Sequence, residues 1–188
     1  MTKLRTFGFT LIELLIAMGI FVFLIMIAGP MYAEFMGNSQ IRNAAENTLT
    51  GVRLAQTSAV QSNKAAKFVI DPSVAGGWTV SVYNDETAAY DPPIQAYKWE
   101  EGASRTSVTP LPGGASTVTF DGLGRVVANG YPAVADGTAS LTRVDVTNTS
   151  VTAGTRALRI QISAVGGTAA TKLCDPAVST SNDPRICS

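Results

Sequence analysis

The sequence predicts an α+β chain, in which one long N-terminal helix packs on an antiparallel β-sheet domain and its first half spans a membrane. Three observations support this prediction. Residues 14 to 33 include no Asp, Glu, Lys or Arg, apolar residues then recur at helical spacing, and from residue 67 short β-like segments alternate with loops rich in Gly and Pro. A chain of 188 residues is long enough for one domain with an appended helix.

The composition excludes several classes of enzyme. The chain has no His, which removes Ser-His-Asp and Cys-His catalysis and His-ligated metals. Its 2 Cys are too few for a structural zinc site or an iron–sulfur cluster. The formal net charge is zero, so no global basic field attracts nucleic acid. We therefore expect a protein that is not an enzyme, with no catalytic residue, metal or cofactor.

The N-terminal apolar run allows three interpretations. A secretory signal peptide would explain Lys3 and Arg5, but the best cleavage position, after Ala33, has the large Met31 at −3. A plain transmembrane anchor would explain the length, because 20 residues at 1.5 Å each cover the roughly 30 Å hydrocarbon core of a bilayer. It leaves Glu13 at the edge of the run unexplained. The third interpretation accounts for that carboxylate.

Residues 8–15, Gly-Phe-Thr-Leu-Ile-Glu-Leu-Leu, resemble the class III signal of type IV prepilins and pseudopilins. In that family a short basic leader ends in Gly and is cut on the cytoplasmic side of the membrane, and the next residue is N-methylated. The resemblance implies a leader of residues 1–8, cleavage by a prepilin peptidase between Gly8 and Phe9, methylation of Phe9, and a role for Glu13 in assembly. It also implies that residues 9–35 form a hydrophobic transmembrane and assembly helix.

The physical chemistry of Glu13 agrees with that implication. A carboxylate in hydrocarbon is costly unless it is paired, and the new α-ammonium of Phe9 in a neighbouring subunit could neutralise it. The alternative is that Glu13 only reaches up to the headgroup layer. Further along the same helix, Pro30 removes one backbone donor and clashes with the preceding turn, so we expect a kink or local melting there.

Residues 36–66 are predicted to form the amphipathic half of the same helix. Their apolar positions are spaced by three or four residues, which places them on one helical face. These positions are Ile41, Ala45, Leu49, Val52, Ala55 and Ala59. Because the stripe is rich in alanine, it needs a close-packed partner such as a sheet.

Residues 67–188 are predicted to form the antiparallel β domain. Candidate strands are 67–70, 78–83, 96–99, 117–120, 125–128, 141–146 and 157–163. Alternation is clearest in the last, where Leu158, Ile160 and Ile162 point to one side. Residues 91–93 and 110–114, rich in Pro and Gly, are predicted to be loops.

Several segments resemble the H-type minor pilins and pseudopilins (GspH-, FimT- and FimU-like). Residues 52–60 resemble that family's helix end, and residues 120–125, Phe-Asp-Gly-Leu-Gly-Arg, resemble its Phe-x(3)-Gly-Arg element between two strands. The last strand, leading to Gly166-Gly167 and then Cys174, resembles its terminal hairpin.

Two features of the C-terminal half could be mistaken for chemical sites. Cys174 and Cys187, an even pair near the end of an exported domain, are predicted to form a disulfide that closes a terminal loop. A redox-active pair would favour a C-x-x-C spacing instead. The Asp121 to Gly124 stretch offers one carboxylate, whereas a Ca²⁺ site needs several oxygen ligands, so a turn between strands is the better interpretation.

Nucleic acid is not favoured as a partner, although the sequence leaves it open. After Arg159 the C-terminal region has only Lys172 and Arg185 as cations, and Asp175 and Asp183 offset them. Arg143, Arg156 and Arg159 would form a local basic patch if their strands were adjacent.

Together these features predict a structural subunit of a type IV pilus-like filament, most similar to a minor pilin or pseudopilin that promotes assembly. Two alternatives remain: a major pilin, favoured by the C-terminal disulfide loop, and a DNA-binding minor pilin of a DNA-uptake system. The resemblance implies other pilin subunits, a prepilin peptidase and the inner-membrane assembly platform as partners. It places the chain in the inner membrane before assembly and afterwards in a periplasmic or cell-surface filament. The sequence does not distinguish a type IV pilus from a type II secretion system.

Overall fold

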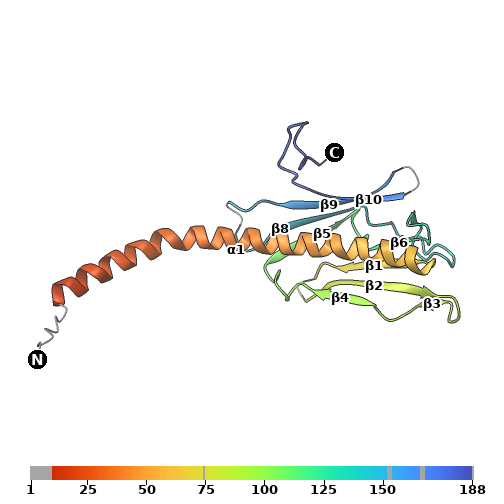
Figure 1. Ribbon diagram of the computed structural model, residues 1–188, viewed down its shortest axis with the longest axis horizontal. Helices are drawn as coiled ribbons and strands as arrows, with labels where there is room; N and C mark the ends of the chain where they lie inside the picture. Colours follow the sequence, from red (N-terminus) through yellow and green to blue (C-terminus); the bar gives the residue numbers. More distant parts are fainter. Residues whose placement is uncertain (1–9, 74, 152–153, 166–167, 188) are drawn as a thin grey trace, which may run out of the picture.

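The computed structural model describes residues 10–73, 75–151, 154–165 and 168–187. One long helix is followed by a series of short strands (Figure 1). In chain order the elements are α1 (Leu11–Ser62), β1 (Ala66–Asp71), β2 (Gly77–Asn84), β3 (Ala89–Tyr90), β4 (Gln95–Lys98), β5 (Thr106–Leu111), β6 (Thr117–Phe120), β7 (Val126–Val127), β8 (Arg143–Asn148), β9 (Leu158–Val165) and β10 (Thr168–Cys174).

The strands form two sheets that share one helix. The first has the order β3-β2-β1-β6-β7, with β4 also paired to β2, and the second has the order β10-β9-β8-β5. Every pairing between these strands is antiparallel. The C-terminal part of α1 runs along both sheets, and its N-terminal part projects beyond them (Figure 1). This is the α+β arrangement that the sequence predicts.

Both ends of α1 have caps that the sequence encodes. Thr10 is in the extended region, and its side-chain oxygen accepts a hydrogen bond from the backbone N–H of Glu13 at 3.3 Å. Asn63 adopts the left-handed conformation at the C-terminal end, with φ 52°, which Asn tolerates better than most residues. The helix therefore ends at Ser62, and β1 begins at Ala66, so the predicted amphipathic segment 36–66 includes the turn between them.

The helix is continuous through Pro30, so the local melting that the sequence allowed does not occur. A proline costs one backbone hydrogen bond, which the turns on either side can tolerate when the axis bends. Figure 1 shows the projecting half of α1 as a curved helix. A kink centred on Pro30 stays a prediction, because the curvature is not confined to one turn in this view.

The core lies between the C-terminal half of α1 and both sheets. All six stripe positions predicted for the helix are buried, together with Ala44, Thr48 and Gly51. Gly51 lets the helix approach the first sheet, because a Cβ there would lie 2.8 Å from Phe68 Cε2. On the second sheet the buried side chains follow the predicted alternation, as Val144, Val146, Ile160 and Ile162 show.

Strand assignment from the sequence was incomplete. Each predicted strand has a counterpart, but β3, β5 and β10 were not among the candidate strands, and the predicted loop 110–114 is wrong for Pro110 and Leu111, which belong to β5. Proline fits there because β5 is an edge strand of the second sheet, where Pro110 pairs only with Val144 of β8. On its open side β5 needs no backbone donor.

Candidate functional site

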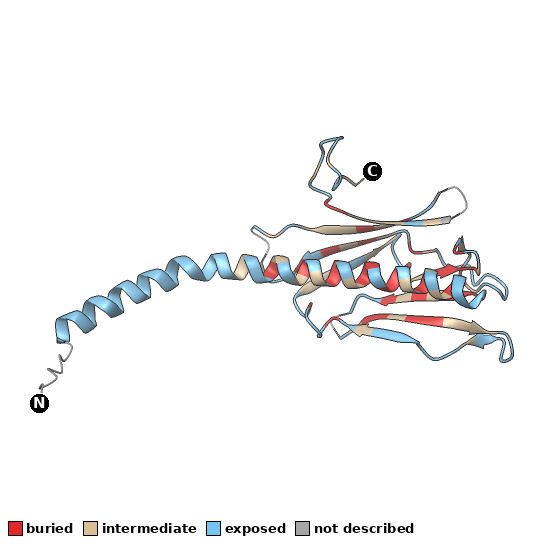
Figure 2. Ribbon diagram, viewed as in Figure 1, coloured by how far each residue is buried: buried red, intermediate tan, exposed pale blue. Residues whose placement is uncertain are grey.

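The projecting half of α1 is the most unusual surface of the molecule. Every residue from 11 to 32 is exposed (Figure 2), and the exposed side chains include large ones such as Leu15, Phe21 and Phe23. By length and composition this helix could cross a membrane. So large an apolar surface is not stable in water, so it requires a bilayer or the apolar surface of another protein.

Glu13 lies in the first turn of this projecting half. Its backbone N–H bonds to Thr10, and its carboxylate forms no ion pair within the part of the chain that the structure describes. Gly8 and Phe9, the predicted cleavage and methylation positions, lie outside the described residues. The predicted pairing of Glu13 with a neighbouring Phe9 ammonium therefore stays a prediction.

Where α1 enters the domain, the segment between β8 and β9 holds it. The Asn38 side chain donates to the carbonyl of Gly154 at 3.2 Å and accepts from the backbone N–H of Arg156 at 2.9 Å. Gly37 allows this approach, since a Cβ there would lie 2.9 Å from the Thr155 methyl carbon. We call these two hydrogen bonds of Asn38 the latch. The sequence did not predict it, because no motif distinguishes Asn38 from other polar residues on a helix.

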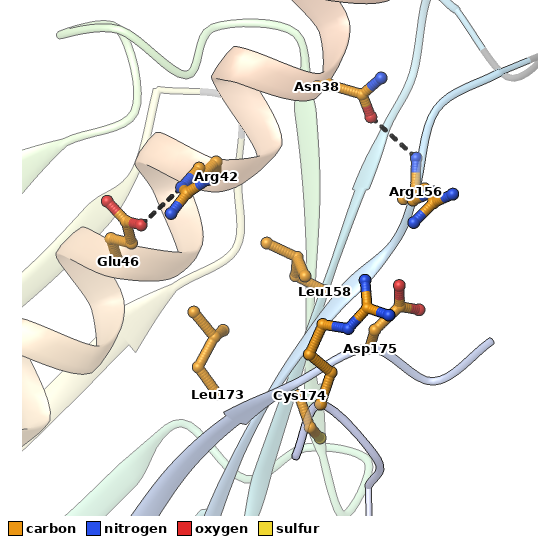
Figure 3. Close-up of a pocket in the computed structure, with 9 residues that line it drawn as sticks. Asn38, Arg42, Glu46, Arg156, Leu158, Leu173, Cys174 and Asp175 are labelled. Atoms are coloured by element: carbon orange, nitrogen blue, oxygen red, sulfur yellow. Dashed lines mark hydrogen bonds and ion pairs between the residues drawn. The ribbon is translucent and has the colours of Figure 1, made fainter. Parts of the chain in front are cut away.

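Beside the latch, a groove of about 380 Å³ separates α1 from β9, β10 and the C-terminal loop (Figure 3). Leu158 and Leu173 contribute its apolar surface. Arg42 on the helix is paired with Glu46, with 2.7 Å between Nε and Oε1. Both side chains are largely exposed, so this pair contributes little stability.

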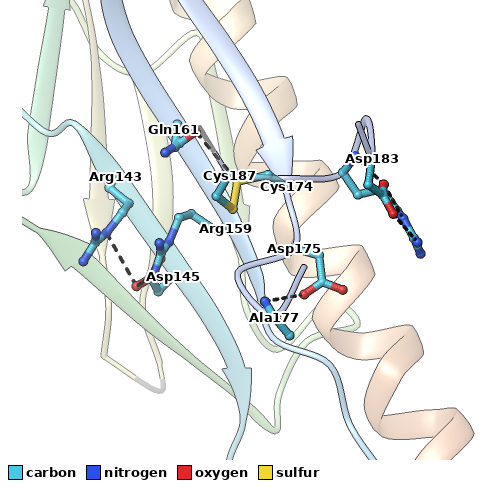
Figure 4. Close-up of a disulfide and its surroundings, with 10 residues drawn as sticks. Arg143, Asp145, Arg159, Gln161, Cys174, Asp175, Ala177, Asp183 and Cys187 are labelled. Carbon is cyan, nitrogen blue, oxygen red and sulfur yellow. Dashed lines mark hydrogen bonds and ion pairs between the residues drawn. A yellow bond between two sulfur atoms is a disulfide. The ribbon is translucent and has the colours of Figure 1, made fainter. Parts of the chain in front are cut away.

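The C-terminal loop is fastened to β10 by the disulfide between Cys174 and Cys187 (Figure 4). The two ends of the loop also meet through the backbone, where Asp175 N–H donates to the Arg185 carbonyl at 2.8 Å. Within the loop, hydrogen bonds from Arg185 lower the pKa of Asp183 to about 2. The loop is therefore a closed, internally bonded unit on the surface.

The predicted basic patch forms only in part. Arg143 on β8 and Arg159 on β9 are close together, but Asp145 lies between them (Figure 4). Arg159 makes two hydrogen bonds to that carboxylate, at 2.7 and 3.1 Å, and this pairing raises the pKa of the arginine. Arg156 is not part of this cluster and instead lines the groove between α1 and β9. Because one carboxylate offsets the two paired arginines, the arrangement does not favour a phosphate backbone.

The Phe-x(3)-Gly-Arg segment forms a turn between β6 and β7 in which Asp121 is buried while Leu123 and Arg125 are exposed. Asp121 Oδ1 accepts backbone N–H bonds from Leu123 and Arg125, while Oδ2 accepts from the Arg125 guanidinium. Burial acts to raise the pKa of Asp121, but these hydrogen bonds and the Arg125 charge outweigh it, so the pKa lies below its ordinary value. Within the described residues no group of three acidic, Cys or His side chains could hold a metal ion.

Two family profiles match the chain. Residues 44–166 match the type II transport protein GspH, and residues 3–29 match the prokaryotic N-terminal methylation motif. The first match covers most of the chain, from the buried half of α1 to the end of β9.

The chain belongs to the GspH family.

Among solved structures, the chain is similar to two crystal forms of the type IV minor pilin FimU of Pseudomonas aeruginosa. The first has 17% identity, a TM-score of 0.49, and coverage of 76% of this chain and 97% of that chain. The second has 16% identity, a TM-score of 0.47, and coverage of 72% and 97%. No curated protein matches the chain.

Membership of the GspH family together with the methylation motif makes the chain a minor pilin or pseudopilin subunit of a type IV filament. The motif match includes Gly8, Phe9 and Glu13, and the GspH match includes the turn at Asp121. The loop that the Cys174–Cys187 disulfide closes lies beyond the GspH match, which ends at residue 166.

Proposed function

We propose that this GspH-family chain is a low-abundance subunit that promotes filament assembly, and that it enters the filament through the projecting half of α1. The observation that supports this most is that the large apolar side chains of residues 11–32 are all exposed, although the second half of the same helix is packed on the domain. A second apolar surface is needed to cover them.

Processing precedes assembly in this proposal. A prepilin peptidase cuts between Gly8 and Phe9, Phe9 is methylated, and the inner-membrane assembly platform receives the mature chain. The helix then leaves the bilayer and packs against the helices of other pilin subunits, with the β domain on the outside in the periplasm or at the cell surface. The methylation-motif match over residues 3–29 supports these steps.

In this proposal Glu13 acts in docking. Its carboxylate is the only charged group in the described part of the helix before Glu34, so the helix cannot neutralise it from within that segment. The ammonium of Phe9 in a neighbouring subunit supplies the opposite charge, and the low dielectric of a helical bundle strengthens that pair.

The test is filament incorporation of Glu13→Ala and Glu13→Gln in the native host. Both variants should keep cleavage at Gly8 and a folded β domain, and both should be depleted from sheared filaments by about tenfold or more, because the charge matters more than the shape. Thr10→Ala, one turn away, removes only a capping hydrogen bond and serves as the matched control. Incorporation of both Glu13 variants at the wild-type level would refute this role.

The two alternatives make different predictions. A major pilin would be the most abundant protein of sheared filaments, whereas an assembly-promoting subunit is present in few copies. A DNA receptor would shift DNA in a gel with a strong dependence on salt. The pairing of Arg143 and Arg159 with Asp145 supports the assembly role over DNA capture.

A further inference from the structure

A second pocket lies at the junction between the projecting and the packed halves of α1. Its volume is about 370 Å³. The helix contributes Tyr32, Met36 and Gln40 to it, and the domain contributes Arg105 and Val151. The described residues that line it include no Asp or Glu. The nearest carboxylate on the helix, Glu34, lies instead against Gly154 on the latch side.

Two polar groups of this pocket have no partner within the described residues. Gln40 Oε1 is buried and accepts no hydrogen bond there, so the amide oxygen has lost water without replacing it. The exposed guanidinium of Arg105 forms no ion pair in the described chain. The backbone of Arg105 is held in place, because its carbonyl accepts hydrogen bonds from both the backbone N–H and the hydroxyl of Thr149.

The position of the pocket along α1 coincides with the headgroup layer of a bilayer. The uncharged run of residues 14–33 covers about 30 Å at 1.5 Å per residue, which is the hydrocarbon thickness. Gln40 follows seven residues later, about 10 Å further along the axis. Tyr32 lies at the end of the run, where interfacial aromatic residues are common. The pocket, which extends from Tyr32 to Gln40, therefore begins at the edge of the hydrocarbon and spans the headgroup layer when the run spans the membrane.

We propose that this pocket binds the headgroup of a phospholipid while the chain is in the membrane. Arg105 bonds to the phosphodiester, and a donor on the headgroup, an ethanolamine ammonium or a glycerol hydroxyl, donates to Gln40 Oε1. The acyl chains follow Met36 and Tyr32 toward the hydrocarbon. Such a lipid holds the junction upright on the membrane until the helix leaves for the filament. This inference rests on the membrane stage of the proposed function, not on the assembly role of Glu13.

Native mass spectrometry of the full chain, extracted in mild detergent from membranes of phosphatidylethanolamine and phosphatidylglycerol, tests the site. The wild type should retain one phospholipid, and Arg105→Gln and Gln40→Leu should each lower the retained fraction by about tenfold. Arg53→Gln is the matched control, since Arg53 is an exposed arginine 13 residues beyond Gln40 on α1, and it should retain the lipid. Arg105→Lys, which keeps the charge, should retain it within a few-fold.

Three results would overturn the proposal: equal retention by all variants, equal loss in Arg53→Gln, or retention of phosphatidylcholine, which has no headgroup donor, as strongly as of the other two lipids. If the Arg105 side chain served only the structure of the domain, Arg105→Lys would lose the lipid as Arg105→Gln does. Glu13→Ala should keep the lipid. Failure of the lipid site and failure of the assembly role are therefore separate outcomes.

Discussion

The two halves of α1 belong to one continuous helix but have opposite compositions and opposite environments. The projecting half carries large Leu, Ile, Phe and Met side chains, all of them exposed in residues 11–32. The packed half buries mainly small residues, among them Gly37, Ala44, Ala45, Thr48 and Gly51. The more apolar half is thus the one that the domain leaves uncovered.

This difference shows that burial within the chain follows fit rather than hydrophobicity alone. Small side chains let the helix axis approach two sheets closely, as the contact of Gly51 with Phe68 and Trp78 shows. The large side chains of the projecting half are as apolar as lipid tails, and they can also make dispersion contacts with the side chains of other helices. One half is therefore built for folding and the other for an external partner.

The largest effect should come from a charge placed in the packed half. Val52 is fully buried against the sheets, so Val52→Asp should destabilise the domain by more than about 3 kcal/mol or unfold it. Leu24→Asp puts the same charge into the projecting half, where Leu24 is exposed, and should leave the unfolding temperature of the domain unchanged. Thermal unfolding of the two full chains in detergent compares them. Equal destabilisation would contradict the division into two halves.

The sequence predicted the helix and its buried stripe well, because alanine and leucine at 3.6-residue spacing leave few alternatives. It predicted the strands less completely. Strand β5 was predicted as a loop because it contains Pro110, and the local sequence does not show that a strand lies at the edge of a sheet, where proline is tolerated. Strand β3 has only two residues, which is too short to show alternation. The latch at Asn38 and the pocket at Gln40 and Arg105 depend on residues more than 60 positions apart in the chain, and no local pattern reports them.

The disulfide should contribute the next largest effect. Cys174→Ser with Cys187→Ser opens a loop of 13 residues' separation and should lower the free energy of unfolding by about 2–4 kcal/mol. Filament entry should survive at a permissive temperature, because the loop borders the packed half of α1, at Asn38 and Arg42, and not the projecting half. Alkylation of the unreduced wild type should label neither thiol, and labelling of both would show that the bridge is not formed in the exported protein.

The latch at Asn38 lies where the projecting half of α1 ends and the packed half begins, and its loss should have a smaller effect. Asn38→Ala removes two hydrogen bonds to the segment between β8 and β9 and should cost about 1–2 kcal/mol. Ser39→Ala, at the exposed neighbouring position, is the control. Hydrogen exchange should show faster opening of residues 37–41 only in the Asn38 variant. Unchanged protection there would mean that packing at Gly37 alone holds the junction.

The smallest effect concerns the turn at Asp121. Asp121→Asn keeps one acceptor but loses the charge opposite Arg125, so it should cost about 1 kcal/mol at neutral pH. Because the folded-state pKa of Asp121 is depressed, this contribution is present above the ordinary carboxyl pKa and is lost as the pH falls through the folded value. Denaturant unfolding of wild type and variant should therefore converge in acid. A constant difference down to about pH 2 would contradict the charge argument.

Photo-cross-linking in assembled filaments tests the central claim most directly. A photoreactive amino acid at Leu24, in the middle of the projecting half, should link the chain to the helix of another pilin subunit in sheared filaments. The same group at Leu123, an exposed position of the β domain between β6 and β7, is the control for cross-links that arise only because subunits are close together. The account predicts a helix-to-helix product from Leu24 that is absent before assembly, when lipid is the partner. A Leu24 probe that captures only lipid, in filaments that contain the chain, would contradict it.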